Sequence, residues 1–249
     1  MSVDPSNSLR EHRRHLGTWL SLGSPVVAEL AATSGFDWLL FDLEHGCGTE
    51  TALLPQLQAI RGTAAAAIVR VGAPQADLIG RVLDWGADGI MVPHISSAEE
   101  AAACVRAMRY PPLGERGVSR SVRAYGYGLR PFEPAAPLFM AQIETIEAVE
   151  RAAEIAQVKG VDVLFVGPAD LQFDLQARPE KAVRDFAACL VHVAAAAAAA
   201  GKAGGLLLRD RTDLPRMLEL GFTHIAIDSD LGLLRAGYQN ILSLTSQKT

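Results

Sequence analysis

The chain has 249 residues and is 49% hydrophobic, which is enough for one large core or two small ones. Its net charge of −5 at pH 7 argues against a nucleic-acid partner. The alanine run at 194–200 is far too short for a membrane span, and no apolar signal segment opens the chain, so no membrane partner is expected. Three cysteines without metal-ligand spacing are typical of a reducing compartment, so we expect a cytoplasmic protein.

Strand-like and helix-like segments alternate along the chain. Apolar runs of strand length predict strands at Gly17–Leu22, Trp38–Leu43, Ala66–Val71, Gly89–Pro93, Leu138–Ile143, Val161–Val166, Gly205–Leu208 and His224–Ile227. Helical patterns follow at Pro25–Ser34, Glu50–Arg61, Gln75–Trp85, Ser97–Arg109, Ile146–Val158, Lys181–Ala200, Leu214–Leu220 and Leu231–Asn240. Because no linker or charge block divides the chain, we expect one domain over 1–249, with an N-terminal arm at 1–15 and a long loop at 110–137.

Eight strand–helix units in this length predict a (β/α)8 TIM barrel, which is an α/β fold. A doubly wound open sheet is the rival fold. It normally carries a glycine-rich phosphate turn after the first strand, and Gly17–Ser24 has no such motif. The barrel also predicts where the active site lies, because in this fold the site forms at the carboxyl ends of the strands.

The second predicted strand ends in Asp42, Glu44 and His45. Two carboxylates and an imidazole would be costly inside a core, so this segment predicts a site that handles protons or lies beside a metal. His45 is the first choice for a general base, because imidazole accepts and donates protons near neutral pH. His94, at the end of the fourth predicted strand, is a second candidate, for substrate contact.

The fifth and sixth predicted strands end in carboxylates of their own. Glu144 and Asp170 are candidate ligands for a hard divalent cation such as Mg²⁺, with Gln142 as a supporting hydrogen-bond donor. On spacing alone, Asp170 fits equally well as the cap of a following helix, so both interpretations stay open.

Arg70 ends the third predicted strand, where its guanidinium suits a carboxylate or a developing enolate oxygen. The alternative is an ion pair with a neighbouring strand-end carboxylate such as Asp42. Asp84 lies late in a helix, and its position in the sequence gives no reason to place it at the barrel mouth.

The long loop at 110–137 is rich in arginine, tyrosine and glycine. Loops of this length in compact domains tend to be functional lids or interface arms. Because it follows a helix, we expect it to start on the face opposite the active site. Its basic residues either face solvent or an interface, or bind an anionic substrate; they include Arg116, Arg120 and Arg123.

Several motifs in one order resemble the HpcH/HpaI family of class II, metal-dependent pyruvate aldolases. The resemblance runs from about Gly17 to Leu234. Its most specific parts are Gly35-Phe-Asp-Trp-Leu, Asp42-Leu-Glu-His-Gly, Val69-Arg-Val, Leu83-Asp-Trp-Gly-Ala, Gln142-Ile-Glu-Thr, Gly160-Val-Asp and Phe165-Val-Gly-Pro-Ala-Asp-Leu.

The resemblance implies a role for each matching residue at the metal and pyruvate site. Glu144 and Asp170 resemble the ligands of a divalent metal, which would be Mg²⁺, Mn²⁺ or Co²⁺. Arg70 resembles the arginine that contacts the pyruvate oxygen and the enolate, and Gln142 lies beside it in the substrate site. The backbone amides of Ala169 and Asp170 resemble those that hold the pyruvate carboxylate.

The resemblance also assigns the proton chemistry. His45 resembles the catalytic base and Asp84 its carboxylate partner, which gives the helix-end aspartate a role that its position did not suggest. Asp42 and Glu44 then become supporting groups that orient His45, Arg70 or metal-bound water.

The family resemblance implies a (β/α)8 barrel whose last helix, Leu231–Asn240, is exchanged between subunits of a homo-oligomer, usually a hexamer built as a trimer of dimers. The implied activity is reversible cleavage of a 4-hydroxy-2-oxo acid into pyruvate and an aldehyde, through a metal-stabilised pyruvate enolate. The substrates are small molecules of aromatic or sugar-acid catabolism.

Two segments depart from the family pattern, at 172–175 and 202–208, and both border the expected aldehyde site, so the aldehyde stays open. Two other lyase activities are alternatives: decarboxylation of oxaloacetate and cleavage of an acyl-CoA substrate. The compact chain argues against the acyl-CoA lyase. A catalytically silent barrel scaffold is the alternative from a different class, against which the full set of candidate catalytic groups argues.

Overall fold

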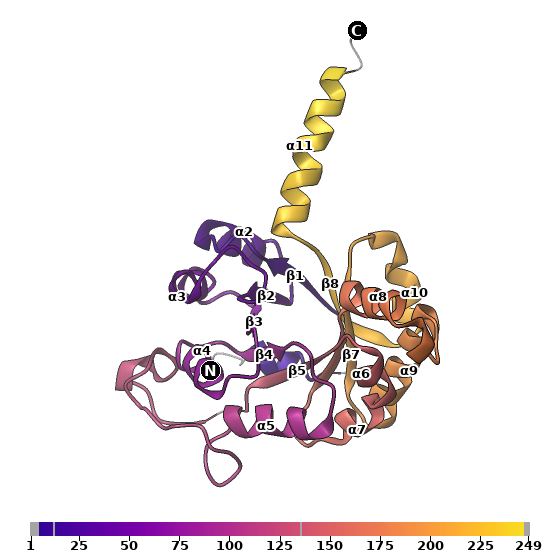
Figure 1. The fold of residues 1–249 in the computed structure, drawn as a ribbon. Coiled ribbons are helices and arrows are strands. Elements are labelled where there is room, and N and C mark those ends of the chain that lie inside the picture. The colour runs from indigo at the N-terminus through magenta and orange to yellow at the C-terminus, as the bar shows by residue number, and fades with distance from the viewer. Residues whose placement is uncertain (1–4, 12, 135, 247–249) are drawn as a thin grey trace.

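The computed structural model describes residues 5–11, 13–134 and 136–246. Eight parallel strands pair in chain order, and β1 pairs with β8 to close a barrel (Figure 1). The predicted (β/α)8 barrel is therefore confirmed. The strands are β1 (His15–Leu20), β2 (Trp38–Asp42), β3 (Ala66–Arg70), β4 (Gly89–Val92), β5 (Leu138–Ile143), β6 (Val163–Val166), β7 (Ala203–Leu208) and β8 (Phe222–Ser229).

Helices follow the strands and surround the barrel (Figure 1). No helix in the described part of the chain combines the length and apolar composition that a bilayer crossing requires. The helices of the body are α1 (Pro5–Ser8), α2 (Pro25–Thr33), α3 (Glu50–Ala59), α4 (Ala76–Asp84), α5 (Ala98–Met108), α6 (Ile146–Glu150), α7 (Ala152–Gln157), α8 (Pro168–Ala177), α9 (Phe186–Ala199) and α10 (Leu214–Glu219). The last helix, α11 (Asp230–Ser246), projects away from the body.

The helices differ from the predicted ones after the fifth and sixth strands. The sequence prediction missed α8, because Leu171 is its one buried side chain and no apolar period marks it. The helix predicted from Lys181 begins only at Phe186, where the Asp185 side chain accepts a hydrogen bond from the Ala188 N–H at 2.8 Å. The helix predicted over Ile146–Val158 is interrupted at Arg151, between α6 and α7.

Alternate residues of each strand build two separate cores. Leu39 and Phe41 of β2 face the surrounding helices, whereas Trp38 and Leu40 fill the barrel interior. A Cβ atom on Gly17 would overlap the Trp38 ring, so β1 needs glycine there to admit this large side chain. The filled interior leaves room for chemistry only at the barrel ends.

The amino-terminal end of the barrel is closed by Leu9 and two histidines. Leu9 is 1% exposed, although it lies in the segment expected to form an arm. His15 of β1 and His224 of β8 are both fully buried, with ring centroids 4.9 Å apart. His224 Nε2 lies 2.8 Å from the Leu9 carbonyl oxygen. This contact joins the N-terminal segment to the last strand.

The buried histidine pair predicts a loss of stability in acid. Burial, together with the neighbouring His15, lowers the pKa of His224 to about 4. In the unfolded chain His224 therefore binds a proton as the pH falls below about 6.5, whereas in the folded chain it does so only near pH 4. The free energy of unfolding should fall over this window, by on the order of 3 kcal/mol from His224 alone.

Urea unfolding of wild type and His224→Gln at several pH values between 4 and 7 measures this contribution. Glutamine retains an N–H for the Leu9 carbonyl but does not titrate. The wild-type midpoint should fall more steeply with acid than that of the variant. Identical slopes would show that His224 is not the titrating group.

Candidate active site

Asp42 and Arg70 form the centre of the polar cluster at the carboxyl ends of the strands. They are register partners at the ends of β2 and β3. Arg70 Nε donates to Asp42 Oδ1 at 3.0 Å, and its Nη2 donates to Oδ2 at 2.7 Å. The expected alternative for Arg70, an ion pair with Asp42, is therefore present. This ion pair does not exclude a second role for Arg70, because the residue also lines the cavity at this end of the barrel.

A second carboxylate fixes the same guanidinium. Glu44 Oε2 lies 2.9 Å from Arg70 Nη1 as an ion pair, whereas Asp42 accepts hydrogen bonds from two of the five guanidinium N–H groups. Burial alone would raise the pKa of Asp42. The hydrogen bonds and charge of Arg70, with the N–H groups of His45 and Glu44, outweigh burial and hold that pKa below its usual value. The N–H groups of Arg70 that Asp42 does not take are available to a substrate oxygen in the cavity.

His45 lies in the loop after β2, at the rim of the cavity. Its backbone N–H donates to Asp42 Oδ1 at 3.2 Å, which orients the loop. Its imidazole is 69% exposed, with Nε2 3.8 Å from Glu44 Oε1. Asp42 and Glu44 thus each contact both Arg70 and His45. An exposed imidazole in this position can reach a bound substrate.

Glu144 follows β5 and is 2% exposed. Gln142 Nε2 donates to its Oε2 at 2.5 Å, and the His94 backbone N–H donates to its Oε1 at 2.6 Å. Burial raises the pKa of Glu144; the carboxylates of Asp170 and Glu44 add to this rise, and His94 opposes it. Three carboxylates that disfavour one another's charge suit a site for a cation.

The oxygen atoms around Glu144 suit a hard metal ion as ligands. Gln142 Oε1 is buried and accepts no hydrogen bond within the described residues. No group of three His, Cys, Asp or Glu side chains in the described ranges could enclose a metal by itself. Mg²⁺ does not require one, because it keeps several waters and uses one or two carboxylates together with substrate oxygens. Glu144 and Asp170 supply such a pair.

The α8 helix begins beside these carboxylates. Gly167 is its N-cap and Pro168 its first residue, so Asp170 lies in the first turn and does not cap the helix; its carboxylate lines the cavity. The N–H groups of Ala169 and Asp170 belong to the first turn, which has no intrahelical acceptors. A Cβ on Gly167 would lie 2.5 Å from Glu144 Oε2, so glycine is needed here. The arrangement forms a cradle for a carboxylate.

The cavity at this end of the barrel has a volume of about 410 Å³. It brings together His45, Arg70, Gln142, Ala169 and Asp170, which sequence analysis took from four different strand ends. Glu44 and Glu144 lie behind the lining residues, in contact with them.

Asp84 is not near this cavity in a single chain. It is the last residue of α4, a helix that runs back from the carboxyl end of β3 to the amino end of β4. Its Oδ1 lies 2.6 Å from Arg116 Nη2 of the long loop. Within one chain, the structure therefore does not bring Asp84 and His45 together.

Sequence analysis missed two cationic residues and one anchor at this site. Arg209, just after β7, and Arg235 of α11 line the cavity. Asp230 is 6% exposed and accepts the N–H groups of Ser21 and Leu22 at 3.0 Å each, which joins β1 to the start of α11. Arg209 could have been found from the sequence, because it follows a predicted strand. Arg235 and Asp230 could not, because no sequence pattern predicts that α11 begins beside the cavity.

The family model described as HpcH/HpaI aldolase/citrate lyase matches residues 15–236. The chain belongs to this family. A 5-keto-4-deoxy-D-glucarate aldolase of Salmonella arizonae is 39% identical over 238 residues, which cover 94% of this chain and 93% of the relative. Among solved structures, a family member from Burkholderia cenocepacia has a TM-score of 0.88 at 35% identity, covering 96% of this chain and 99% of that one. The HpcH/HpaI aldolase of Desulfitobacterium hafniense has a TM-score of 0.85 at 28% identity, with 98% and 96% covered.

This HpcH/HpaI family member is a metal-dependent aldolase, and hence a lyase. The resemblance seen in the sequence motifs is confirmed over the same span. The citrate lyase beta subunit of Mycobacterium tuberculosis has a TM-score of 0.57 at 21% identity, which is a likeness of fold alone. The acyl-CoA lyase alternative gains no support from it.

Proposed function

We propose that the enzyme reversibly cleaves a 4-hydroxy-2-oxo acid into pyruvate and an aldehyde within the 410 Å³ cavity. The observation that carries the proposal is Arg70, fixed by two carboxylates yet with donors left for a substrate oxygen, in one cavity with His45 and Asp170. The first candidate substrate is 5-keto-4-deoxy-D-glucarate, because the relative 39% identical to this chain is named for it.

Glu144 and Asp170 would hold the metal, which we propose to be Mg²⁺, Mn²⁺ or Co²⁺. When bound, the metal supplies Lewis-acid stabilisation of negative charge on the pyruvate-derived oxygen. Gln142 orients Glu144 through its 2.5 Å hydrogen bond and thereby holds the ligand in place.

The chain's own groups bind the pyruvate half of the substrate. The first-turn N–H groups of Ala169 and Asp170 hold its carboxylate at the start of α8. Arg70 donates to the keto oxygen, where negative charge grows as the carbon–carbon bond breaks. Because Asp42 and Glu44 fix the guanidinium beforehand, no reorganisation is needed when that charge develops.

His45 moves the proton. In the cleavage direction its imidazole takes the proton of the C4 hydroxyl, directly or through a water, as the aldehyde forms. In the synthetic direction it returns the proton to the aldehyde-derived oxygen. Glu44 Oε1 lies 3.8 Å from Nε2 and helps to orient the ring.

His45→Ala is expected to lower retro-aldol turnover by about a hundredfold or more, as is usual when a general base is lost. The fold should be unaffected, because the side chain is largely exposed. Pyruvate released from a panel of 4-hydroxy-2-oxo acids, including 5-keto-4-deoxy-D-glucarate, measures both activity and preference. Thr49→Ala, an exposed side chain in the same loop, is the matched control. Wild-type turnover in His45→Ala would remove His45 from its role.

We propose that the aldehyde fragment is acidic. Arg209 and Arg235 line the same cavity as Arg70 and Asp170. Arg209 Nη1 is 3.8 Å from Asp228 and the side chain is 67% exposed, so most of its donors can reach a ligand. Cleavage of 5-keto-4-deoxy-D-glucarate leaves a carboxylate on its aldehyde fragment, which these arginines would bind.

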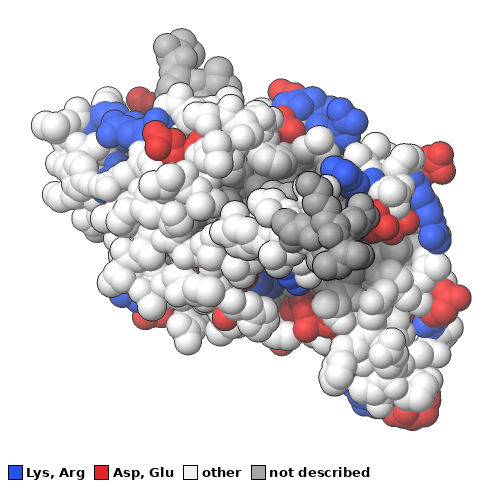
Figure 2. All heavy atoms as spheres, turned by 90° about the horizontal axis from the view of Figure 1, so that it is seen from above, with Lys and Arg blue, Asp and Glu red and all other residues white. Residues whose placement is uncertain are grey.

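We propose that the enzyme is a homo-oligomer, a hexamer built as a trimer of dimers, in which α11 packs on a neighbouring subunit. The helix stands off the barrel body, and its contacts within the chain lie at β1 and β8 (Figure 1). Large areas of the face from which it projects carry no charge (Figure 2). An isolated helix with many exposed apolar side chains needs a partner surface. The exposed apolar side chains of α11 include Leu233, Leu234, Tyr238, Ile241 and Leu244.

An assembly of this kind also gives Asp84 a place in the site. Because Asp84 and His45 lie at opposite ends of one barrel, the pair implied by family resemblance requires Asp84 from a second copy. We propose that neighbouring subunits bring the two together.

The double variant Leu234→Glu/Ile241→Glu is expected to reduce the assembly from about six chains of 26.5 kDa to dimers or monomers. Charged groups on the apolar face of α11 would be costly to bury in a subunit contact. Light scattering after size-exclusion chromatography measures the mass. Gln239→Glu adds a charge at an exposed polar position of the same helix and should leave the assembly intact. An unchanged mass for the double variant would exclude α11 from the contact.

A further inference from the structure

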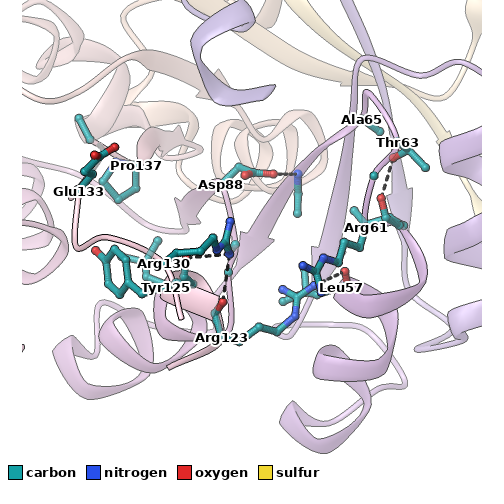
Figure 3. A pocket seen from close by; sticks show the side chains of 18 of the residues that line it. Leu57, Arg61, Thr63, Ala65, Asp88, Arg123, Tyr125, Arg130, Glu133 and Pro137 are labelled. Carbon is teal, nitrogen blue, oxygen red and sulfur yellow. Dashed lines mark hydrogen bonds between the residues drawn. The ribbon is translucent and has the colours of Figure 1, made fainter. Parts of the chain in front are cut away.

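A second cavity, of about 690 Å³, lies at the amino-terminal end of the barrel, opposite the active site (Figure 3). Its walls are the α3–β3 turn, the segments that enter β3 and β4, and the long loop that ends at Pro137. The aldolase chemistry makes no use of it. Four arginines line it, against two carboxylates: Arg61, Arg116, Arg123, Arg130, Asp88 and Glu133.

Three of these arginines form no ion pair within the described residues. Arg123 donates to two backbone carbonyls, Trp85 at 2.5 Å and Leu57 at 2.9 Å, which hold it in place without neutralising it (Figure 3). Arg130 donates to the Ala124 carbonyl at 3.2 Å. The Arg61 guanidinium, on the turn after α3, is exposed. Three positive charges, one from the α3–β3 turn and two from the long loop, thus line one cavity.

The fourth arginine is buried and keeps an unused donor. Arg116 is 8% exposed, and its Nη2 pairs with Asp84. Its Nε–H is buried and has no hydrogen-bond partner among the described residues. An unpartnered buried donor is costly, and it belongs to a residue that lines the cavity.

The carboxylates of the lining are fewer than its arginines. Asp88 Oδ2 accepts the Ala67 N–H at 2.7 Å, and Glu133 is exposed. Burial lowers the pKa of Arg123; the charges of Arg61 and Arg130 also lower it, whereas Tyr127 and Asp88 oppose this shift. The excess is local, because the whole chain carries a net charge of −5.

We propose that this cavity is a binding site for a small organic anion that carries at least two phosphate or carboxylate groups. Guanidinium forks bind both groups in the same bidentate way. More than one anionic group is needed because the unpaired guanidinium groups come from different segments, the α3–β3 turn and the loop. Such a ligand would tie the loop at 110–137 to the barrel.

Isothermal titration calorimetry on the assembled, EDTA-treated enzyme tests the site. Fructose 1,6-bisphosphate represents phosphate ligands, tricarballylate represents carboxylate ligands, and fructose is the uncharged control. We expect a dissociation constant below about 1 mM for at least one of the two anions.

Arg61→Glu and Arg130→Glu should each weaken that binding by at least about tenfold, since both side chains are exposed and neither replacement disturbs an ion pair within the described residues. Arg216→Glu, an exposed arginine of α10, is the matched control and should bind as wild type does. The proposal is overturned if neither anion binds, or if the Arg61 and Arg130 variants bind as tightly as the control.

Discussion

Treatment with EDTA is expected to abolish retro-aldol activity, and added Mg²⁺, Mn²⁺ or Co²⁺ to restore it. Glu144 is buried beside Asp170 and Glu44, and its pKa is raised by burial and by those charges. A divalent cation would remove that repulsion and complete its shell with water and substrate. Activity that is indifferent to the chelator would sink the metal assignment.

Glu144→Gln sharpens the same prediction. The substitution removes one ligand charge at nearly constant shape, so the metal concentration for half-maximal activity should rise by about tenfold or more, with lower turnover at saturation. Titration of activity with each metal, alongside calorimetric metal binding, provides the two readouts. Glu154→Gln removes an exposed carboxylate of α7 and should change neither.

The second large effect is expected at Arg70. Arg70→Ala should lower kcat by about 10²–10³, because it removes a fixed donor at the oxygen where charge develops. It should also cost about 3–5 kcal/mol of stability, since Asp42 would stay buried without its partner. Steady-state kinetics and urea unfolding measure the two losses separately.

Arg70→Lys separates the two roles of that side chain. Lysine keeps the positive charge beside Asp42 but lacks the planar fork, so most of the stability should return while turnover stays at least about tenfold low. Arg81→Ala, which removes the exposed pair with Glu50, should cost less than about 1 kcal/mol. Full activity in Arg70→Lys would mean that the fork is not what the substrate requires.

The barrel and most of its active end follow from local patterns in the sequence. An apolar run that stops at a polar residue predicts a strand and the position of its carboxyl end. Because the strands of the barrel are parallel, these carboxyl ends lie together. Asp42, His45, Arg70 and Asp170 therefore come to one mouth as predicted. The roles of these residues in catalysis stay predictions.

What the sequence could not predict depends on contacts between distant segments. Helix α8 has one buried residue, so periodicity could not reveal it, although Pro168 was a start signal. Asp84 shares a motif with the site but lies at the other end of the barrel. The arginines of the loop were visible, whereas their meeting with Arg61 in one cavity required the fold.

The most direct measurement of the central claim is proton exchange at the pyruvate methyl group, followed by NMR in D₂O without any aldehyde. An enzyme that forms the pyruvate enolate at this site should exchange those protons when Mg²⁺, Mn²⁺ or Co²⁺ is present and stop when EDTA is added. The Glu144→Gln variant should exchange them slowly, and the Glu154→Gln variant at the wild-type rate. Methyl protons that persist with every metal would contradict the account.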